Sequence, residues 1–83
     1  MRFISALADY MEYKRIVAKP FREEIDLGCN RTIHSVFFDE NETLCIGIED
    51  CGYLFSEEVD DNYAEMIIDH LLETEGIFIP VDE

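Results

Sequence analysis

The sequence predicts an α+β fold: an antiparallel β-sheet of three to five short strands, covered by an N-terminal helix and by an amphipathic helix in the C-terminal half. Two patterns predict this fold. Apolar residues recur at helical spacing over residues 62–74, whereas β-branched and aromatic residues cluster over 32–38 and 44–48 around a polar turn. The chain has 83 residues and is 48% hydrophobic, so we expect a single acidic domain over residues 1–83.

The first expected element is a helix over residues 2–17. One helical stripe contains four of its apolar residues, Phe3, Leu7, Tyr10 and Val17. Pro20 requires the helix to end shortly before it, because the residue that precedes a proline disfavours helical backbone angles. A strand over residues 13–18 is the competing interpretation.

Strand patterns occupy the middle of the chain. A loose alternation over residues 21–27 predicts a short edge strand. Residues 32–38 and 44–48 predict a β-hairpin, with the polar turn at 39–42 between its strands. A brief strand is expected at residues 53–55, after another turn.

Residues 62–74 have the clearest helical pattern of the chain. One broad face holds seven apolar residues, Tyr63, Ala64, Met66, Ile67, Ile68, Leu71 and Leu72. Asn62, followed by Glu65, fits the spacing of a capping box, and Ser56 and Asp60 are alternative starts.

Gly76 is expected to end this helix, because glycine readily adopts the left-handed conformation that closes a helix. Residues 77–81 are then expected to form a last strand. Pro80 places that strand at a sheet edge, since proline has no N–H for a ladder hydrogen bond.

The formal net charge is −14, from 20 acidic and 6 basic side chains. Such a charge repels nucleic acid and anionic membranes and attracts basic protein surfaces. All the basic residues lie within the first 31 positions, and residues 32–83 contain 15 acidic residues and no Lys or Arg. Most of the chain therefore lacks local charge compensation.

Four acidic residues of the C-terminal helix recur at four-residue spacing, Asp61, Glu65, Asp69 and Glu73. On a helix they form a ridge of carboxylates with steps of about 6 Å. Like charges at this spacing destabilise a helix by about a few tenths of a kcal/mol per pair. A sequence selected for folding alone favours lysine at some of these positions, so the ridge predicts a contact with a basic partner.

Other acidic residues cluster in the predicted turns and beside the helix, namely Asp39, Glu40, Glu42, Glu49, Asp50, Glu57, Glu58 and Asp60. We expect them to extend the partner-binding surface of the ridge. The alternative is that the acidic residues are only a solvated face, since an amphipathic helix always needs a polar side.

The sequence predicts no metal, no cofactor and no catalytic residue. Five residues could ligate zinc in principle, but they lack ligand-like spacing: Cys29, Cys45, Cys51, His34 and His70. Buried small thiols are the better interpretation of the cysteines. Asp39, Asn41 and Thr43 have the spacing of the start of an EF-hand loop, but Leu44 stands where that loop requires glycine. Without a nucleophile motif or a phosphate-binding glycine loop, we expect the protein not to be an enzyme.

A small acidic α+β domain with a carboxylate ridge resembles a functional class rather than one family. The class includes phage DNA mimics, anti-CRISPR proteins and bacterial immunity proteins that block nuclease toxins. The resemblance implies an inhibitor that binds the basic nucleic-acid-binding surface of a target protein. We expect it to be monomeric or homodimeric and cytoplasmic, because Asp9 and Glu12 interrupt the apolar N-terminal segment that a secretory signal would need. The negative charge predicts no direct contact with nucleic acid or membrane.

Within that class, a phage anti-CRISPR or anti-restriction protein is expected first, and an immunity protein or antitoxin second. A different alternative is an adaptor or oligomerisation domain whose charge only gives solubility. A homo-oligomer of this kind would pair an edge strand such as residues 21–27.

Overall fold

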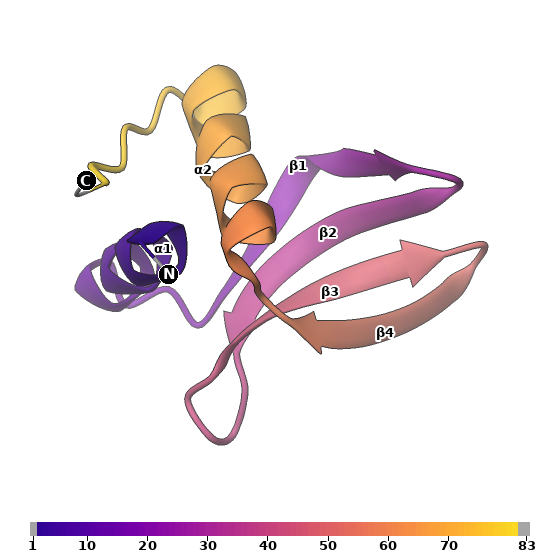
Figure 1. The fold of residues 1–83 in the computed structure, drawn as a ribbon, viewed down its shortest axis with the longest axis horizontal. Coiled ribbons are helices and arrows are strands. Elements are labelled where there is room, and N and C mark those ends of the chain that lie inside the picture. The colour runs from indigo at the N-terminus through magenta and orange to yellow at the C-terminus, as the bar shows by residue number, and fades with distance from the viewer. Residues whose placement is uncertain (1, 82–83) are drawn as a thin grey trace. The chain divides into compact units, whose positions relative to one another are not determined.

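The computed structural model describes residues 2–81 and has the α+β fold that the sequence predicts, with one antiparallel sheet and two helices (Figure 1). The elements in chain order are α1 (Arg2–Tyr13), β1 (Ala18–Gly28), β2 (Arg31–Phe38), β3 (Leu44–Asp50), β4 (Tyr53–Glu58) and α2 (Asp61–Glu75). The chain divides into two compact units. We call residues 2–16 and 59–81 the helical unit, and residues 17–58 the sheet unit.

The strands of the sheet unit lie side by side in their sequence order, β1-β2-β3-β4, and each neighbouring pair is antiparallel. The predicted hairpin is confirmed: β2 and β3 pair from Phe38↔Leu44 to Arg31↔Asp50. Because each strand pairs with the one before it, the sheet needs only short connections.

Backbone with positive φ makes two of these connections tight. Cys51 and Gly52 have φ of 50° and 88°, which suits a two-residue turn whose twist matches that of the flanking strands. Between β1 and β2, Gly28, Cys29 and Asn30 have φ of 82°, 53° and 61°. The φ values of Cys51 and Gly52 thus confirm the turn that the sequence predicts at Gly52.

Strand β3 is buried along most of its length. Residues 44–48 are all buried, although large apolar side chains alternate there with Cys45 and Gly47. A Cβ added at Gly47 would lie 2.5 Å from Oγ of Ser35 and 3.0 Å from a ring carbon of His34. A larger residue at position 47 would therefore have to displace the side chains of Ser35 and His34.

The cysteines differ in their surroundings, and all three are free thiols. Cys45 is buried in β3, as predicted. The same prediction was wrong for Cys29 and Cys51, which are exposed because they occupy positive-φ positions of the turns.

Strand β1 is longer than the predicted strand over residues 21–27, and its pairing with β2 is interrupted. The register passes from Pro20↔Ser35 to Ile25↔Ile33, so several residues of β1 bulge out of the ladder. Ile25 returns to a buried position after the bulge.

Helix α1 ends at Tyr13, four residues before the predicted limit at Val17. Arg15 has φ of 56°, and the N–H of Ile16 donates to the carbonyl of Met11 at 2.8 Å. This left-handed closure ends the helix well before Pro20 can act on it. Val17 is 78% exposed, so its assignment to the apolar stripe was wrong, as was the competing strand over residues 13–18.

Helix α2 begins after Asp60, whose carboxylate accepts a hydrogen bond from the N–H of Tyr63 at 2.8 Å. The alternative start at Asp60 is confirmed, and the expected cap at Asn62 was wrong because Asn62 already lies inside the first turn. At the other end, Gly76 has φ of 68°, and its N–H donates to the carbonyl of Leu72. Gly76 therefore ends the helix, as predicted.

The last strand expected over residues 77–81 was wrong, because this segment has no regular secondary structure. The N–H of Ile77 donates to the carbonyl of Leu71 at 3.1 Å and so completes the helix closure. Pro80 has no N–H to donate. The segment still buries Ile79, which belongs to the helical unit.

The buried side chains of the helical unit come mainly from the facing sides of its helices, which pack against each other. From the helices these are Leu7 and Met11 of α1, and Ala64, Ile67, Ile68 and Leu71 of α2. Within residues 2–81, neither helix has the length and apolar character needed to cross a bilayer.

Replacing Asp60 with alanine should lower the free energy of unfolding by about 1 kcal/mol, because the N–H of Tyr63 loses its acceptor. Urea denaturation measures the unfolding free energy of Asp60→Ala and of a control variant, Asn62→Ala. Asn62 is exposed and does not cap the helix, so its replacement should change stability little. A larger loss in Asn62→Ala would contradict the observed start of α2.

Candidate functional site

The acidic residues proposed as an interface are distributed over both units. The helical unit contains Asp60, Asp61, Glu65, Asp69 and Glu73, and the sheet unit contains Asp39, Glu40, Glu42, Glu49, Asp50, Glu57 and Glu58. By sequence, segments 1–16 and 59–83 together carry ten acidic and three basic residues, and segment 17–58 carries the same numbers. Each unit therefore has a net charge of −7. The uneven distribution of charge along the sequence does not make one unit more acidic than the other.

Asp61 is the first residue of the predicted ridge, and its carboxylate is directed toward α1. One carboxylate oxygen accepts hydrogen bonds from the backbone N–H groups of Phe3, at 2.9 Å, and Ile4, at 3.2 Å. These amides belong to the first turn of α1, which has no partners for them within the helix. Asp61 thus joins the start of α1 to the start of α2 inside the helical unit.

The hydrogen bonds from α1 also decide the protonation of Asp61. Partial burial favours the neutral acid, but the N–H groups of Ile4 and Phe3 stabilise the charged form, and the net effect lowers the pKa of Asp61 below its ordinary value of 3.8. The carboxylate is charged at neutral pH and complements the positive end of the α1 dipole.

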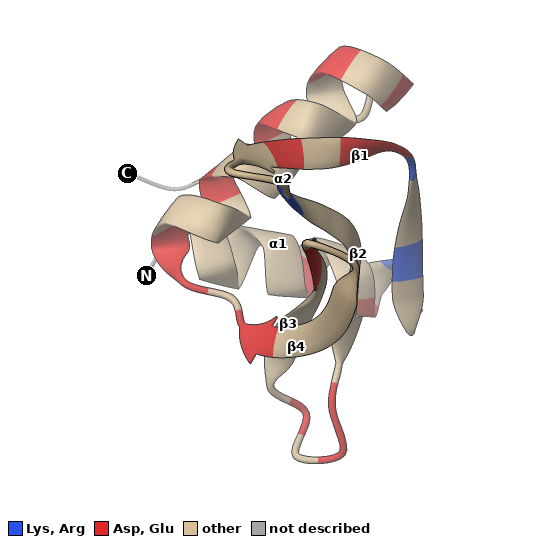
Figure 2. Cartoon of the chain, turned by 90° about the vertical axis from the view of Figure 1, so that its right-hand side faces the viewer, with Lys and Arg blue, Asp and Glu red and all other residues tan. Residues whose placement is uncertain are grey.

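The other three ridge residues, Glu65, Asp69 and Glu73, are exposed along α2. Successive carboxylates are separated by about 6 Å of helix rise, as expected for a four-residue repeat. Within residues 2–81, their side chains form no hydrogen bond or ion pair. Figure 2 shows acidic residues at intervals along α2. These three residues form the candidate site, which we call the α2 ridge.

At the hairpin tip between β2 and β3, Asp39 organises the turn. Its Oδ1 accepts from the N–H groups of Asn41 at 2.8 Å and Thr43 at 2.9 Å, and its Oδ2 lies 3.7 Å from Sγ of Cys45. Burial, followed by the negative charge of Asp39, raises the pKa of the Cys45 thiol. Asp39 therefore stabilises the turn.

Glu40 and Glu42 are exposed at the same tip, and Glu42 has φ of 62°. Their carboxylates have no hydrogen-bond or ion-pair partner within the described part of the chain. The tip thus presents two carboxylates to solvent, and its third acidic side chain is used internally.

Of the acidic residues at the end of β3 and along β4, some have internal partners and others are exposed. Asp50 lies opposite Arg31 in the register, and its Oδ2 is 3.8 Å from Nε of Arg31. A hydrogen bond to Asp50, and then its negative charge, raises the pKa of Cys51. Glu57 and Glu58 are exposed on β4, which is one of the two edge strands.

Four of the twelve predicted interface residues therefore have internal partners, and all four are aspartates: Asp39, Asp50, Asp60 and Asp61. The remaining eight are Glu40, Glu42, Glu49, Glu57, Glu58, Glu65, Asp69 and Glu73, of which Glu49 is half-buried. A short side chain holds its carboxylate close to the backbone, where it can accept from nearby N–H groups. The exposed carboxylates are available to a partner.

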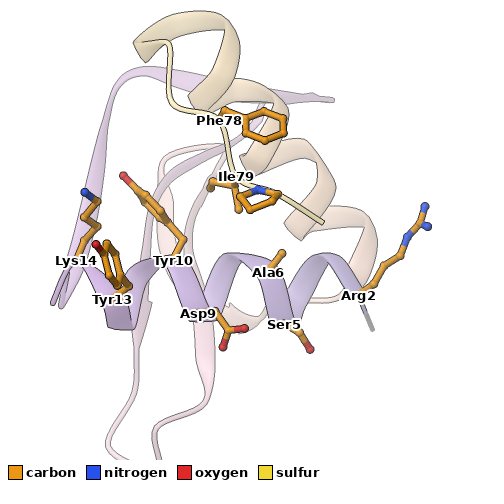
Figure 3. A pocket seen from close by; sticks show the side chains of 10 residues that line it. Arg2, Ser5, Ala6, Asp9, Tyr10, Tyr13, Lys14, Phe78 and Ile79 are labelled. Carbon is orange, nitrogen blue, oxygen red and sulfur yellow. The ribbon is translucent and has the colours of Figure 1, made fainter. Parts of the chain in front are cut away.

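A groove of about 700 Å³ in the helical unit was not anticipated from the sequence. It lies between α1 and the segment after Gly76, where Tyr10, Phe78 and Ile79 lie close together (Figure 3). Arg2 and Lys14 also line it. Sequence reasoning missed the groove because the segment over 77–81 was predicted as a strand of the sheet.

No cluster of three or more His, Cys, Asp or Glu side chains suited to a metal ion occurs within residues 2–81. No protein-family model matches the chain, and no curated protein or solved structure matches it. The interpretation of the α2 ridge therefore rests on its own geometry and charge.

Asp61→Asn should destabilise the protein at neutral pH, because the N–H groups of Phe3 and Ile4 lose a charged acceptor. Since the pKa of Asp61 is lowered in the folded state, its stabilising effect is present above pH 3.8 and is lost as the pH falls through the lower folded value. The difference in unfolding free energy between wild type and Asp61→Asn should therefore shrink in acid. Urea denaturation from neutral pH to about pH 2 measures this difference.

Glu65→Gln is the control for this series, because Glu65 is an exposed carboxylate of the same helix. Its stability at neutral pH should be equal to that of the wild type or slightly higher. A difference for Asp61→Asn that stays constant over the whole pH range would contradict the role assigned to the charge.

Proposed function

We propose that this protein is a small acidic inhibitor that binds the basic nucleic-acid-binding surface of another protein. The observation that carries the proposal is the α2 ridge, a row of three exposed carboxylates that form no ion pair with another described residue. Basic surfaces of this kind are built to receive a row of regularly spaced negative charges.

The ridge is unfavourable for the helix itself. Glu65, Asp69 and Glu73 repel one another at i,i+4 spacing, and Glu73 lies in the last turn, where the helix dipole favours cations. The sequence contains six basic residues, none of them in α2. A function that needs the negative charge accounts for this arrangement, whereas folding does not.

The partner class follows from the chemistry of the ridge. Its steps of about 6 Å are of the same order as the spacing of phosphates along a nucleic-acid strand. Lys and Arg side chains that bind phosphates can bind carboxylates in the same places. The protein would therefore compete with nucleic acid for its target, and the net charge of −14 would speed the encounter.

The double variant Glu65→Lys/Asp69→Lys tests the ridge directly. It converts repulsive pairs of α2 into attractive ones, so the melting temperature should stay the same or rise slightly. Affinity for a captured target should fall by about tenfold or more, because two positive charges would face the basic surface. Differential scanning calorimetry and surface plasmon resonance measure the two properties.

The matched control is Glu23→Lys/Glu24→Lys, which makes the same change of charge at exposed positions of β1. It should bind nearly as well as the wild type. If the α2 variant keeps its affinity and the β1 variant loses it, the interface is not the α2 ridge.

Binding to such a target should weaken strongly as salt is raised from low to several hundred millimolar, mainly through a slower association rate. The target can be isolated by affinity capture from a lysate at low salt, and DNA or RNA that the target binds should displace the protein. Association rates over a salt series and a competition titration check both expectations. A ternary complex with nucleic acid and an affinity insensitive to salt would overturn the proposed function.

A further inference from the structure

Strand β4 forms one edge of the sheet. It pairs with β3 in an unbroken register from Cys45↔Glu58 to Asp50↔Tyr53, and no strand within residues 2–81 pairs with its other side. Alternate residues of such a strand direct their N–H and C=O groups away from the ladder. An outer edge of this kind is a template for another strand.

The residues that face outward follow from the turn before β4. Cys51 and Gly52 form a two-residue turn, so Asp50 and Tyr53 close the hairpin as a hydrogen-bonded pair. Pairs then alternate along the ladder, and the backbone groups of Leu54, Ser56 and Glu58 point outward.

The two edges of the sheet differ in how well they are protected against pairing with an additional strand. On β1 the register is broken, Pro20 lacks an N–H, and charged side chains such as Arg22 and Glu23 are exposed. These are features by which natural sheets prevent edge-to-edge pairing. Strand β4 has no register shift and no proline, and its charged residues, Glu57 and Glu58, are confined to its last two positions. Its edge is therefore open to an added strand.

The first half of β4 also exposes large apolar side chains. Tyr53 is 78% exposed, Leu54 69% and Phe55 39%. Successive residues of a strand point to opposite faces, so Tyr53 and Phe55 lie on one face and Leu54 on the other. A strand added at this edge would bury apolar surface on both of its faces. Consecutive exposed apolar residues beside an open edge are typical of an interaction site.

The second half of β4 determines the charge of the occupant. Glu57 and Glu58 are exposed, one on each face of the strand. A second copy of this chain would bring the same two carboxylates and a net charge of −14. A strand with basic residues opposite Glu57 and Glu58, and apolar residues opposite Tyr53 and Leu54, complements both halves.

We propose that β4 accepts an extended segment of a partner protein as an additional strand of the sheet, and that this segment carries an apolar stretch next to a basic one. Main-chain hydrogen bonds to Leu54 and Ser56 would supply affinity, and the flanking side chains would supply selectivity. This inference goes beyond the proposed function, because β4 lies in the sheet unit and the α2 ridge lies in the helical unit.

The probe is a short fluorescent peptide with a Val-Ile-Phe block next to an Arg-Lys block, made in both sequence directions so that parallel and antiparallel addition are tested. Fluorescence anisotropy measures binding to the full chain, and hydrogen exchange by NMR measures protection of the β4 amides. At least one direction should bind, and the amides of Leu54 and Ser56 should exchange more slowly. The same peptide with a central proline should bind at least tenfold more weakly.

Two variants examine the edge itself. Leu54→Lys replaces an exposed apolar residue by a cation, and Ser56→Pro removes an outward N–H without removing a ladder hydrogen bond to β3. Each should weaken peptide binding by tenfold or more. Val17→Lys is the matched control, because Val17 is apolar, 78% exposed and outside every strand, and it should bind as the wild type does.

Absence of binding and of amide protection at millimolar peptide would overturn the proposal, as would equal affinity of Leu54→Lys and wild type. Self-association through β4 in sedimentation experiments, without peptide binding, would assign the edge to a second copy and overturn the proposed partner. If Ser56→Pro unfolds, the peptide affinity of Leu54→Lys and the exchange data for the wild type test the proposal without it. The variant Glu65→Lys/Asp69→Lys should bind the peptide normally, so failure of the ridge and failure of the β4 edge are distinguishable.

Discussion

The carboxylate of Asp61 holds together two segments that are far apart in the sequence. Its hydrogen bonds to the N–H groups of Phe3 and Ile4 span 58 and 57 positions of the chain. All the strands lie in the sequence between the segments that these hydrogen bonds join. The helical unit therefore closes a long loop when it forms. The packing of Leu7 and Met11 with the apolar face of α2 depends on bringing these two helices together. A buried apolar contact sets no orientation by itself, whereas the hydrogen bonds fix the start of each helix.

The acidic residues of this protein serve two purposes, in folding and in the exposed surface. Asp39, Asp60 and Asp61 accept hydrogen bonds from backbone N–H groups and so complete turns and helix ends. Glu65 and Glu57 extend into solvent. The internal use of the aspartates makes part of the negative charge necessary for folding, and the exposed carboxylates are the part that a function must explain. A net charge of −14 thus overstates the charge offered to a partner.

Much of the fold could be predicted from local patterns. The hairpin of β2 and β3 and the helix α2 follow from periodicity, because their apolar residues repeat at the spacing of the element that they form. The limits of the elements depended on contacts that periodicity does not contain. Helix α1 ends early because Arg15 takes a left-handed conformation, and the expected strand over residues 77–81 is absent because Ile77 completes the closure of α2.

The candidate site could be predicted only in part. The four-residue spacing correctly placed Glu65, Asp69 and Glu73 on one side of a helix. It could not show that Asp61, in the same series, is used by α1, since that contact joins residues remote in sequence. The open edge of β4 was also missed. A run of Tyr, Leu and Phe is typical of a buried strand. Its exposure follows from the order of the strands, which places it at the edge of the sheet.

The insertion of the sheet unit between the two helices has a consequence for biosynthesis. Every strand precedes α2 in the chain, and each strand pairs with its predecessor, so the sheet can assemble hairpin by hairpin as the polypeptide emerges from the ribosome. Helix α1 is made before the strands but packs with α2, which is made after all of them. During translation the apolar side of α1, with Leu7 and Met11, therefore lacks its packing partner until α2 has left the ribosome, and in that interval a chaperone can bind it.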